Sequence, residues 1–221
     1  MDEQIKSYLS KSVKTLNQNF VLVIVLSLTW IFILPRDISL FLGIAGIIIT
    51  PVIYGRFFEI PWRTSYSTFL QLFKQHWLNF WIVMFILGTP LFVVVGLVNG
   101  FAGFMFKFFL EALTLVLGIY TIPFVFITGD KIFSIKSGLK CLWQNFQYSL
   151  PLILLTVLIV IIKKLSLIFV FRSFQENYTA MFAVAFIQNI ILNYISLSVF
   201  MTAVMLLLNK PDFQKYLKPQ T

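Results

Sequence analysis

Residues 14–20 read Lys-Thr-Leu-Asn-Gln-Asn-Phe, and two related heptapeptides follow, Gln-Leu-Phe-Lys-Gln-His-Trp at 71–77 and Lys-Cys-Leu-Trp-Gln-Asn-Phe at 140–146. The three align without gaps, each with a glutamine at the fifth position and an aromatic residue at the seventh. Each leads into a long apolar segment without charge. This order is typical of a helix that first lies at a membrane surface and then enters the bilayer. The sequence therefore predicts an all-α membrane helix bundle built from helical hairpins.

The composition supports a membrane protein. Hydrophobic residues make up 59% of the 221 residues and charged residues only 11%, whereas about a quarter of a soluble domain is charged. We therefore predict one integral membrane domain over residues 1–221. The lone Cys141 and the lone His76 exclude an internal disulfide and a Cys/His metal site. No signal-peptide cleavage pattern follows the first apolar run, which we expect to be retained as a transmembrane helix.

Six apolar segments approach or exceed the length of about 20 residues that a helix needs to cross a bilayer. Their side chains do not alternate in polarity as those of membrane barrel strands do, so all six are predicted to be helices. The predicted spans are residues 20–34, 38–55, 77–98, 108–128, 146–162 and 180–208, and the fifth could continue to 171. Paired in order, they form three hairpin repeats over about residues 1–55, 65–128 and 132–208.

The basic residues predict an orientation. Of the 17 Lys and Arg residues, five fall in the connections on one side of this bundle and twelve on the other side, which also holds both termini. Short cytoplasmic loops carry such an excess of cations. Both termini are therefore predicted to be cytoplasmic, in a multi-pass protein of the bacterial cytoplasmic membrane. The positive charge serves insertion and contact with lipid headgroups, so nucleic-acid binding is not expected. The twelve are Lys6, Lys11, Lys14, Arg56, Arg63, Lys74, Lys131, Lys136, Lys140, Lys210, Lys215 and Lys218.

Amphipathic helices are predicted on the inner leaflet before the third and fifth spans. Gly129 and Asp130 end the fourth span, and residues 66–75 precede the third. After Asp130, apolar residues at helical spacing form the predicted lipid face: Ile132, Ile135, Leu139 and Leu142. Four lysines are expected to contact anionic headgroups: Lys14, Lys131, Lys136 and Lys140. Four tryptophans are expected near the headgroup level: Trp62, Trp77, Trp81 and Trp143.

A family resemblance rests on residues around the third heptapeptide. These are Tyr-Thr-Ile-Pro-Phe-Val at 120–125, Gly-Asp-Lys at 129–131, Ser-Gly-Leu-Lys at 137–140 and Asn-Phe at 145–146. The series resembles a pattern in a broad group of bacterial six-span proteins, which includes the membrane domain fused to some glycerophosphodiester phosphodiesterases. The resemblance covers about 45 residues well and the remainder only by hydropathy. It implies a membrane module and transfers no active site, because nothing in the chain matches the catalytic domain.

Charged residues near the predicted outer surface allow two arrangements. Glu111 follows Lys107 by one turn, so a local ion pair is expected. Lys163 and Lys164 follow 17 residues of the fifth span, which is enough to cross, so their ammonium groups are expected to reach the outer headgroups. If the helix instead continues past them, the two lysines would line a polar cavity and mark an anion or headgroup site.

The last span carries a polar stripe. Asn189, Asn193 and Ser196 recur at helical spacing, with Gln188 beside them. Side-chain amides that face lipid are unfavourable, so the stripe must face protein or water. Interhelical hydrogen bonding is the expected role, and a transport path shared with Glu111, Lys163 and Lys164 is the alternative.

No catalytic residue, cofactor site or metal site is predicted. Any catalytic triad would need His76, which stands where asparagine occupies the other two heptapeptides and is expected to form hydrogen bonds at the membrane surface. The predicted function is a non-enzymatic membrane module, a scaffold or accessory subunit that binds a partner or lipid headgroups through its basic cytoplasmic face. The partner could be another membrane protein or a second copy of the chain. A small transporter or channel that uses the polar stripe is the alternative function.

Overall fold

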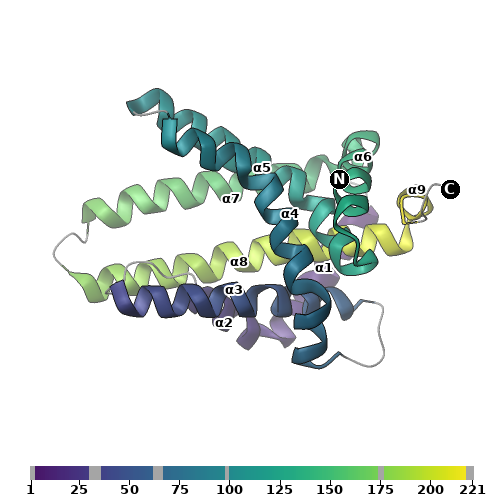
Figure 1. Ribbon diagram of the computed structural model, residues 1–221, viewed down its shortest axis with the longest axis horizontal. Coiled ribbons are helices and arrows are strands. Elements are labelled where there is room, and N and C mark those ends of the chain that lie inside the picture. Colours follow the sequence, from purple (N-terminus) through teal and green to yellow (C-terminus); the bar gives the residue numbers. More distant parts are fainter. Residues whose placement is uncertain (1–2, 30–35, 62–66, 98–99, 174–176, 218–221) are drawn as a thin grey trace.

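The computed structural model describes residues 3–29, 36–61, 67–97, 100–173 and 177–217 (Figure 1). Within these ranges the secondary structure is helical and contains no strand, as the sequence predicts. The helices are α1 Glu3–Gln18, α2 Phe20–Thr29, α3 Arg36–Glu59, α4 Phe69–Leu97, α5 Gly100–Thr128, α6 Lys131–Gln144, α7 Phe146–Ser173, α8 Tyr178–Asn209 and α9 Pro211–Gln214.

Helix α8 lies at the centre of the bundle. It contacts α1, α2, α3, α5, α7 and α9, and every residue from Leu197 to Leu207 is buried. A helix that is apolar on all sides is either enclosed by protein or faces lipid, and the burial of these residues shows that this part of α8 is enclosed by protein. The other helices are arranged around it (Figure 1).

The core has two parts. One lies between α2, α3, α4, α5 and α8 and is rich in phenylalanine, with the rings of Phe58 and Phe126 packed edge to face, their centroids 5.0 Å apart. The other joins the two ends of the chain, because Ile5 of α1 and Phe213 of α9 pack with Tyr120 of α5. This second cluster also holds the buried side of α6. We call this part of the bundle, where α3, α5 and α8 end, the α6 end.

Within the described ranges, four helices are long and apolar enough to cross a membrane: Ile38–Glu59, Met105–Thr128, Phe146–Ser166 and Thr179–Asn209. Helices α1 and α2 would add a fifth if they count as one span, although they meet at an angle of 79°. Many large apolar side chains remain exposed on the outside of the bundle, among them Val21, Phe41, Phe85, Leu154 and Leu165. An apolar exterior of this extent is consistent with a multi-pass membrane protein.

The four helices match the second, fourth, fifth and sixth predicted spans. The first predicted span, 20–34, continues from α2 into residues outside the described part of the chain. The third, 77–98, falls in α4, but residue 98 and several side chains near that end of α4 also lie outside it. The number of six spans and their pairing as three hairpins therefore stay predictions.

The three heptapeptides differ in how they meet the following segment. Asn19 separates α1 from α2, and Asn145 separates α6 from α7. Helix α4, in contrast, runs through His76 without a break. Residues 69–75, predicted to belong to a separate interfacial helix, are instead the first turns of α4.

Helix α6 begins as predicted and packs differently from the prediction. Gly129 has a φ of +72° and ends α5, and the Asp130 carboxylate accepts a hydrogen bond of 2.9 Å from the backbone N–H of Phe133. A Cβ atom at Gly138 would lie 2.6 Å from the Cα of Thr121, so α6 is pressed closely against α5. Leu142, assigned to the lipid face from the sequence, is therefore buried against the protein.

Candidate functional site

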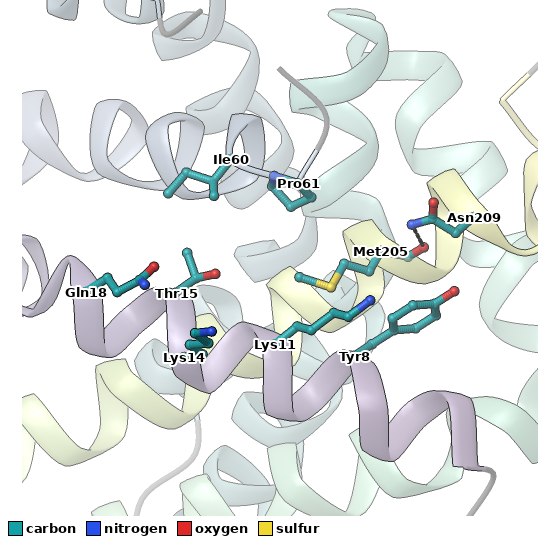
Figure 2. Close-up of a pocket in the computed structure, with 9 residues that line it drawn as sticks. All are labelled: Tyr8, Lys11, Lys14, Thr15, Gln18, Ile60, Pro61, Met205 and Asn209. Atoms are coloured by element: carbon teal, nitrogen blue, oxygen red, sulfur yellow. Dashed lines mark hydrogen bonds between the residues drawn. The ribbon is translucent and has the colours of Figure 1, made fainter. Parts of the chain in front are cut away.

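A pocket of about 410 Å³ lies between α1, the segment that follows α3 and the C-terminal end of α8 (Figure 2). It is a candidate binding site because polar and charged side chains line one part of it and apolar side chains line another. The lining residues are Tyr8, Lys11, Lys14, Thr15, Gln18, Ile60, Pro61, Met205 and Asn209.

The amphipathic pattern of α1 positions the polar part. Ile5, Ser12 and Leu16 are buried, and the Ser12 hydroxyl lies 3.1 Å from that of Thr202 on α8. The neighbouring face of α1 carries the pocket residues 8, 11, 14, 15 and 18, which fall along one side of the helix because 11, 14 and 15 each lie three or four residues from another member of the set. Figure 2 shows these side chains along α1, across the pocket from the segment after α3.

The pocket is basic. The nine described residues that line it include two lysines and no acid. Glu59 stands next to the lining segment, but its two oxygens accept hydrogen bonds from Ser67, at 3.1 Å from the backbone nitrogen and 2.6 Å from the hydroxyl. The ammonium group of Lys11 lies 5.8 Å from the centre of the Tyr8 ring. Such an arrangement attracts an anion.

Sequence reasoning found only part of this pocket. Lys14 was expected to contact headgroups and is one of the lining residues, whereas the pocket roles of Lys11, Thr15, Gln18 and Asn209 were missed. The helical spacing along α1 would have grouped the first three with Lys14. Nothing local predicts that Asn209, nearly two hundred residues later, joins them.

The three lysines of α6 do not line the pocket. Lys136 is exposed, while Lys131 and Lys140 are partly buried. Ile132 and Trp143 are 73% and 83% exposed, and helical spacing places them on the same side of α6 as Lys136. This outward face combines an aliphatic, a cationic and an aromatic side chain.

Two other tryptophans expected near the headgroups, Trp77 and Trp81, form hydrogen bonds to α3. The indole N–H groups of Trp77 and Trp81 donate hydrogen bonds to the carbonyl oxygen of Ile47 in α3, at 2.9 and 2.8 Å. Trp62 lies outside the described residues. The two α4 tryptophans therefore attach α4 to α3.

Glu111 joins α5 to α7 by two ion pairs. One of its oxygens lies 2.6 Å from the ammonium of Lys163 and the other 2.7 Å from that of Lys164. The predicted local pair with Lys107 is therefore wrong, because the carboxylate takes its partners from α7. Helix α7 continues past the two lysines to Ser173, so they lie within a helix rather than at its end. Two cations share one anion here, which leaves one positive charge.

The polar stripe of α8 is divided between two helix contacts. The Gln188 amide donates to the carbonyl oxygen of Lys163 in α7 at 3.3 Å. The amides of Asn189 and Asn193 donate to Ser27 of α2, at 3.5 Å to its carbonyl oxygen and 3.0 Å to its hydroxyl. Ser196 lies half-buried further along α8. The structure thus joins Gln188 to the backbone of α7 at Lys163 and directs the two asparagines toward α2.

The two reactive residue types are both buried. His76 lies in α4 with its ring centre 4.8 Å from that of Phe126. Cys141 is enclosed between α6 and the core, and burial raises the pKa of its thiol. Among the described residues, no group of three His, Cys, Asp or Glu side chains is arranged to hold a metal ion.

Comparison with known proteins identifies no relative of this chain. A scan against protein-family models and searches of the curated proteins and of the solved structures find no match for this chain. The resemblance to the membrane domain of glycerophosphodiester phosphodiesterases therefore stays a prediction.

Proposed function

We propose that this chain is a non-enzymatic multi-pass module of the bacterial cytoplasmic membrane that binds anionic lipid headgroups through its cytoplasmic face. In this proposal six helices cross the bilayer as three hairpins, and both termini and the α6 end of the bundle face the cytoplasm. The excess of Lys and Arg on that side supports the orientation.

The outward face of α6 is the observation that carries the proposal. Helix α6 runs across the direction of α7 and α8 (Figure 1), and its opposite face is held on α5 at Gly138. Ile132, Lys136 and Trp143 are therefore presented outward on a rigid element. Tryptophan favours the headgroup level, an aliphatic side chain favours the acyl boundary, and each lysine near an anionic surface contributes about 1 kcal/mol.

A transporter or channel is supported less well. That alternative uses the polar stripe as a path, and the hydrogen bonds of Asn189 and Asn193 to Ser27 favour a packing role for these two amides. A scaffold or accessory role agrees with headgroup binding, because a helix fixed at the surface leaves the remaining cytoplasmic residues available to a partner protein.

Fluorescence quenching by lipid tests the proposal. The purified protein would be placed in two sets of vesicles of the same lipid composition. In the first set the anionic lipid carries bromine on its acyl chains, and in the second set the neutral lipid carries it. The difference between the wild type and Trp143→Phe isolates the emission of Trp143. We expect the brominated anionic lipid to quench this emission more strongly, because the lysines of α6 enrich it locally.

The matched variant replaces Lys131, Lys136 and Lys140 with Gln. It should abolish the excess quenching by the anionic lipid and leave the average quenching by lipid unchanged, because the depth of Trp143 depends on apolar contacts. Equal quenching by both lipids in the wild type, or quenching of Trp143 by aqueous iodide alone, would overturn the proposal.

A further inference from the structure

The pocket beside α1 contains two lysines and, among the described residues that line it, no acid. Lys11 and Lys14 lie one turn apart on the same helix and both line the pocket. Like charges at this spacing repel each other and destabilise a helix. The lining residues include no acid, and the carboxylate of the neighbouring Glu59 binds Ser67. An anion bound between the two ammonium groups would remove the repulsion.

Hydrogen-bond donors also line the pocket. Thr15 and Gln18 stand on the same side of α1, and Tyr8 lies one turn before Lys11. From α8, Asn209 uses one amide N–H on the carbonyl oxygen of Met205 at 2.9 Å (Figure 2), and its amide group has a second N–H. Hydroxyl and amide donors combined with lysine ammonium groups suit the oxygens of a phosphate.

The remaining wall of the pocket is apolar. Ile60 and Pro61 face α1 from the segment after α3, and Met205 lies on α8 (Figure 2). The volume of about 410 Å³ lies in the range of small-molecule sites, roughly 300–1,000 Å³. It exceeds what a bare phosphate needs, and the apolar wall gives an inorganic ion nothing to contact. A ligand with a phosphate at one end and carbon atoms at the other fits both parts.

We propose that this pocket binds a phosphate ester, with Lys11 and Lys14 at the phosphate and the small organic group against Ile60, Pro61 and Met205. The inference deepens the proposed function, on which it rests for the placement of the α6 end at the cytoplasmic membrane surface. The phosphate ester can be the headgroup of an anionic phospholipid or a soluble glycerol phosphate, since both share this chemistry.

Binding would be measured on the full-length protein in neutral detergent, from its thermal unfolding midpoint during ligand titration. The three probes are dihexanoyl phosphatidylglycerol, glycerol 3-phosphate and, as the neutral comparison, dihexanoyl phosphatidylcholine, all at equal ionic strength. We expect saturable stabilisation by one or both phosphate esters of net negative charge and not by phosphatidylcholine. Response to the short-chain lipid alone assigns the site to a headgroup, and response to glycerol 3-phosphate assigns it to a soluble ester.

Two variants separate this site from the surface of α6. Lys11→Gln with Lys14→Gln should weaken binding by more than about tenfold, since hydrogen bonds to charged groups are the strong ones, while Lys11→Arg with Lys14→Arg should retain it. The α6 variant with Lys131, Lys136 and Lys140 replaced by Gln should bind the probe as the wild type does. No saturable stabilisation of the wild type, or equal binding by the Lys11/Lys14 Gln variant, would overturn the site. Neither result would alter the quenching of Trp143, which tests the proposed function separately.

Discussion

The third heptapeptide and the second begin from related sequences, yet only the third interrupts a helix. At the end of α6, the Asn145 side-chain amide donates to the carbonyl oxygen of Cys141 at 3.0 Å, and its backbone N–H donates to the same oxygen at 3.1 Å. At the equivalent position of the second heptapeptide, His76 lies within a continuous α4 and packs against Phe126.

The first heptapeptide repeats the geometry of the third. The Asn19 side chain donates to the carbonyl oxygen of Thr15 at 2.9 Å, again four residues earlier, and the backbone N–H of Asn19 donates to it at 3.1 Å. A short amide side chain competes with the helix for backbone hydrogen bonds, which favours a helix end. The two heptapeptides with asparagine at the sixth position thus each end in a junction, a break between two helices, whereas the heptapeptide with histidine there lies in an unbroken helix.

The largest expected effect would come from a substitution that separates α6 from α5. It would test whether the junction between α6 and α7 depends on this packing. Gly138→Ala places a methyl group 2.6 Å from the backbone of Thr121, and overpacking of this kind costs about 1–3 kcal/mol. We expect a lower free energy of unfolding in detergent and faster reaction of Cys141 with a thiol reagent. Cys141 is the only cysteine in the chain and is buried in the wild type, with a raised pKa, so it reports directly on the opening of α6.

Gly118→Ala is the matched control. The added methyl group there would meet the end of the flexible Ile122 side chain at 3.0 Å rather than backbone. Its stability should change little, because alanine is also the better helix former. If Gly138→Ala were as stable as this control and Cys141 equally protected, the close contact between α5 and α6 would not be what holds the junction.

The second prediction compares the junction at Asn145 with the junction at Asn19. Asn145 is buried and lies 3.5 Å from the Tyr216 hydroxyl, whereas Asn19 is only half-buried. Asn145→Ala should therefore lower the free energy of unfolding by about 1–1.5 kcal/mol, and Asn19→Ala by about 0.5 kcal/mol. Chemical unfolding of both variants in one detergent checks the order. An equal loss at both sites would show that the hydrogen bond to the preceding carbonyl matters and its burial does not.

Some of this architecture could be predicted from the sequence and some could not, for physical reasons. Apolar length predicts the helices, and the start of α6 follows from Gly129 and Asp130, because these signals act over a few residues. The partners of Glu111 lie 52 and 53 residues away on α7, and a local rule favours Lys107 instead. The pocket was missed for the same reason, since it needs α1, the end of α3 and the end of α8 together.

The continuity of α4 leads to a third prediction. If asparagine alone decided where a helix ends, His76→Asn would create a break like those at the other two heptapeptides. We expect instead that packing keeps α4 continuous and that the loss of the ring contact with Phe126 lowers the free energy of unfolding by about 1 kcal/mol. Helix continuity can be checked by the distance between spin labels on exposed sites either side of residue 76, such as Leu70 and Phe85. A shortened distance would show that the sixth residue is sufficient to end the helix.

The smallest expected effect concerns what holds α2 after the bend at the first junction. Asn193 donates a hydrogen bond of 3.0 Å to the Ser27 hydroxyl, and this hydroxyl in turn donates to the carbonyl oxygen of Val23. Asn193→Ala should therefore cost about 0.6 kcal/mol, the average for such bonds between membrane helices. A double-mutant cycle with Ser27→Ala isolates the interaction, because Ser27→Ala should cost less in the Asn193→Ala background than in the wild type. Additive losses would show that the two side chains do not interact. Loss of a cellular activity without any loss of stability in Asn193→Ala would contradict the packing role and favour a polar path along α8.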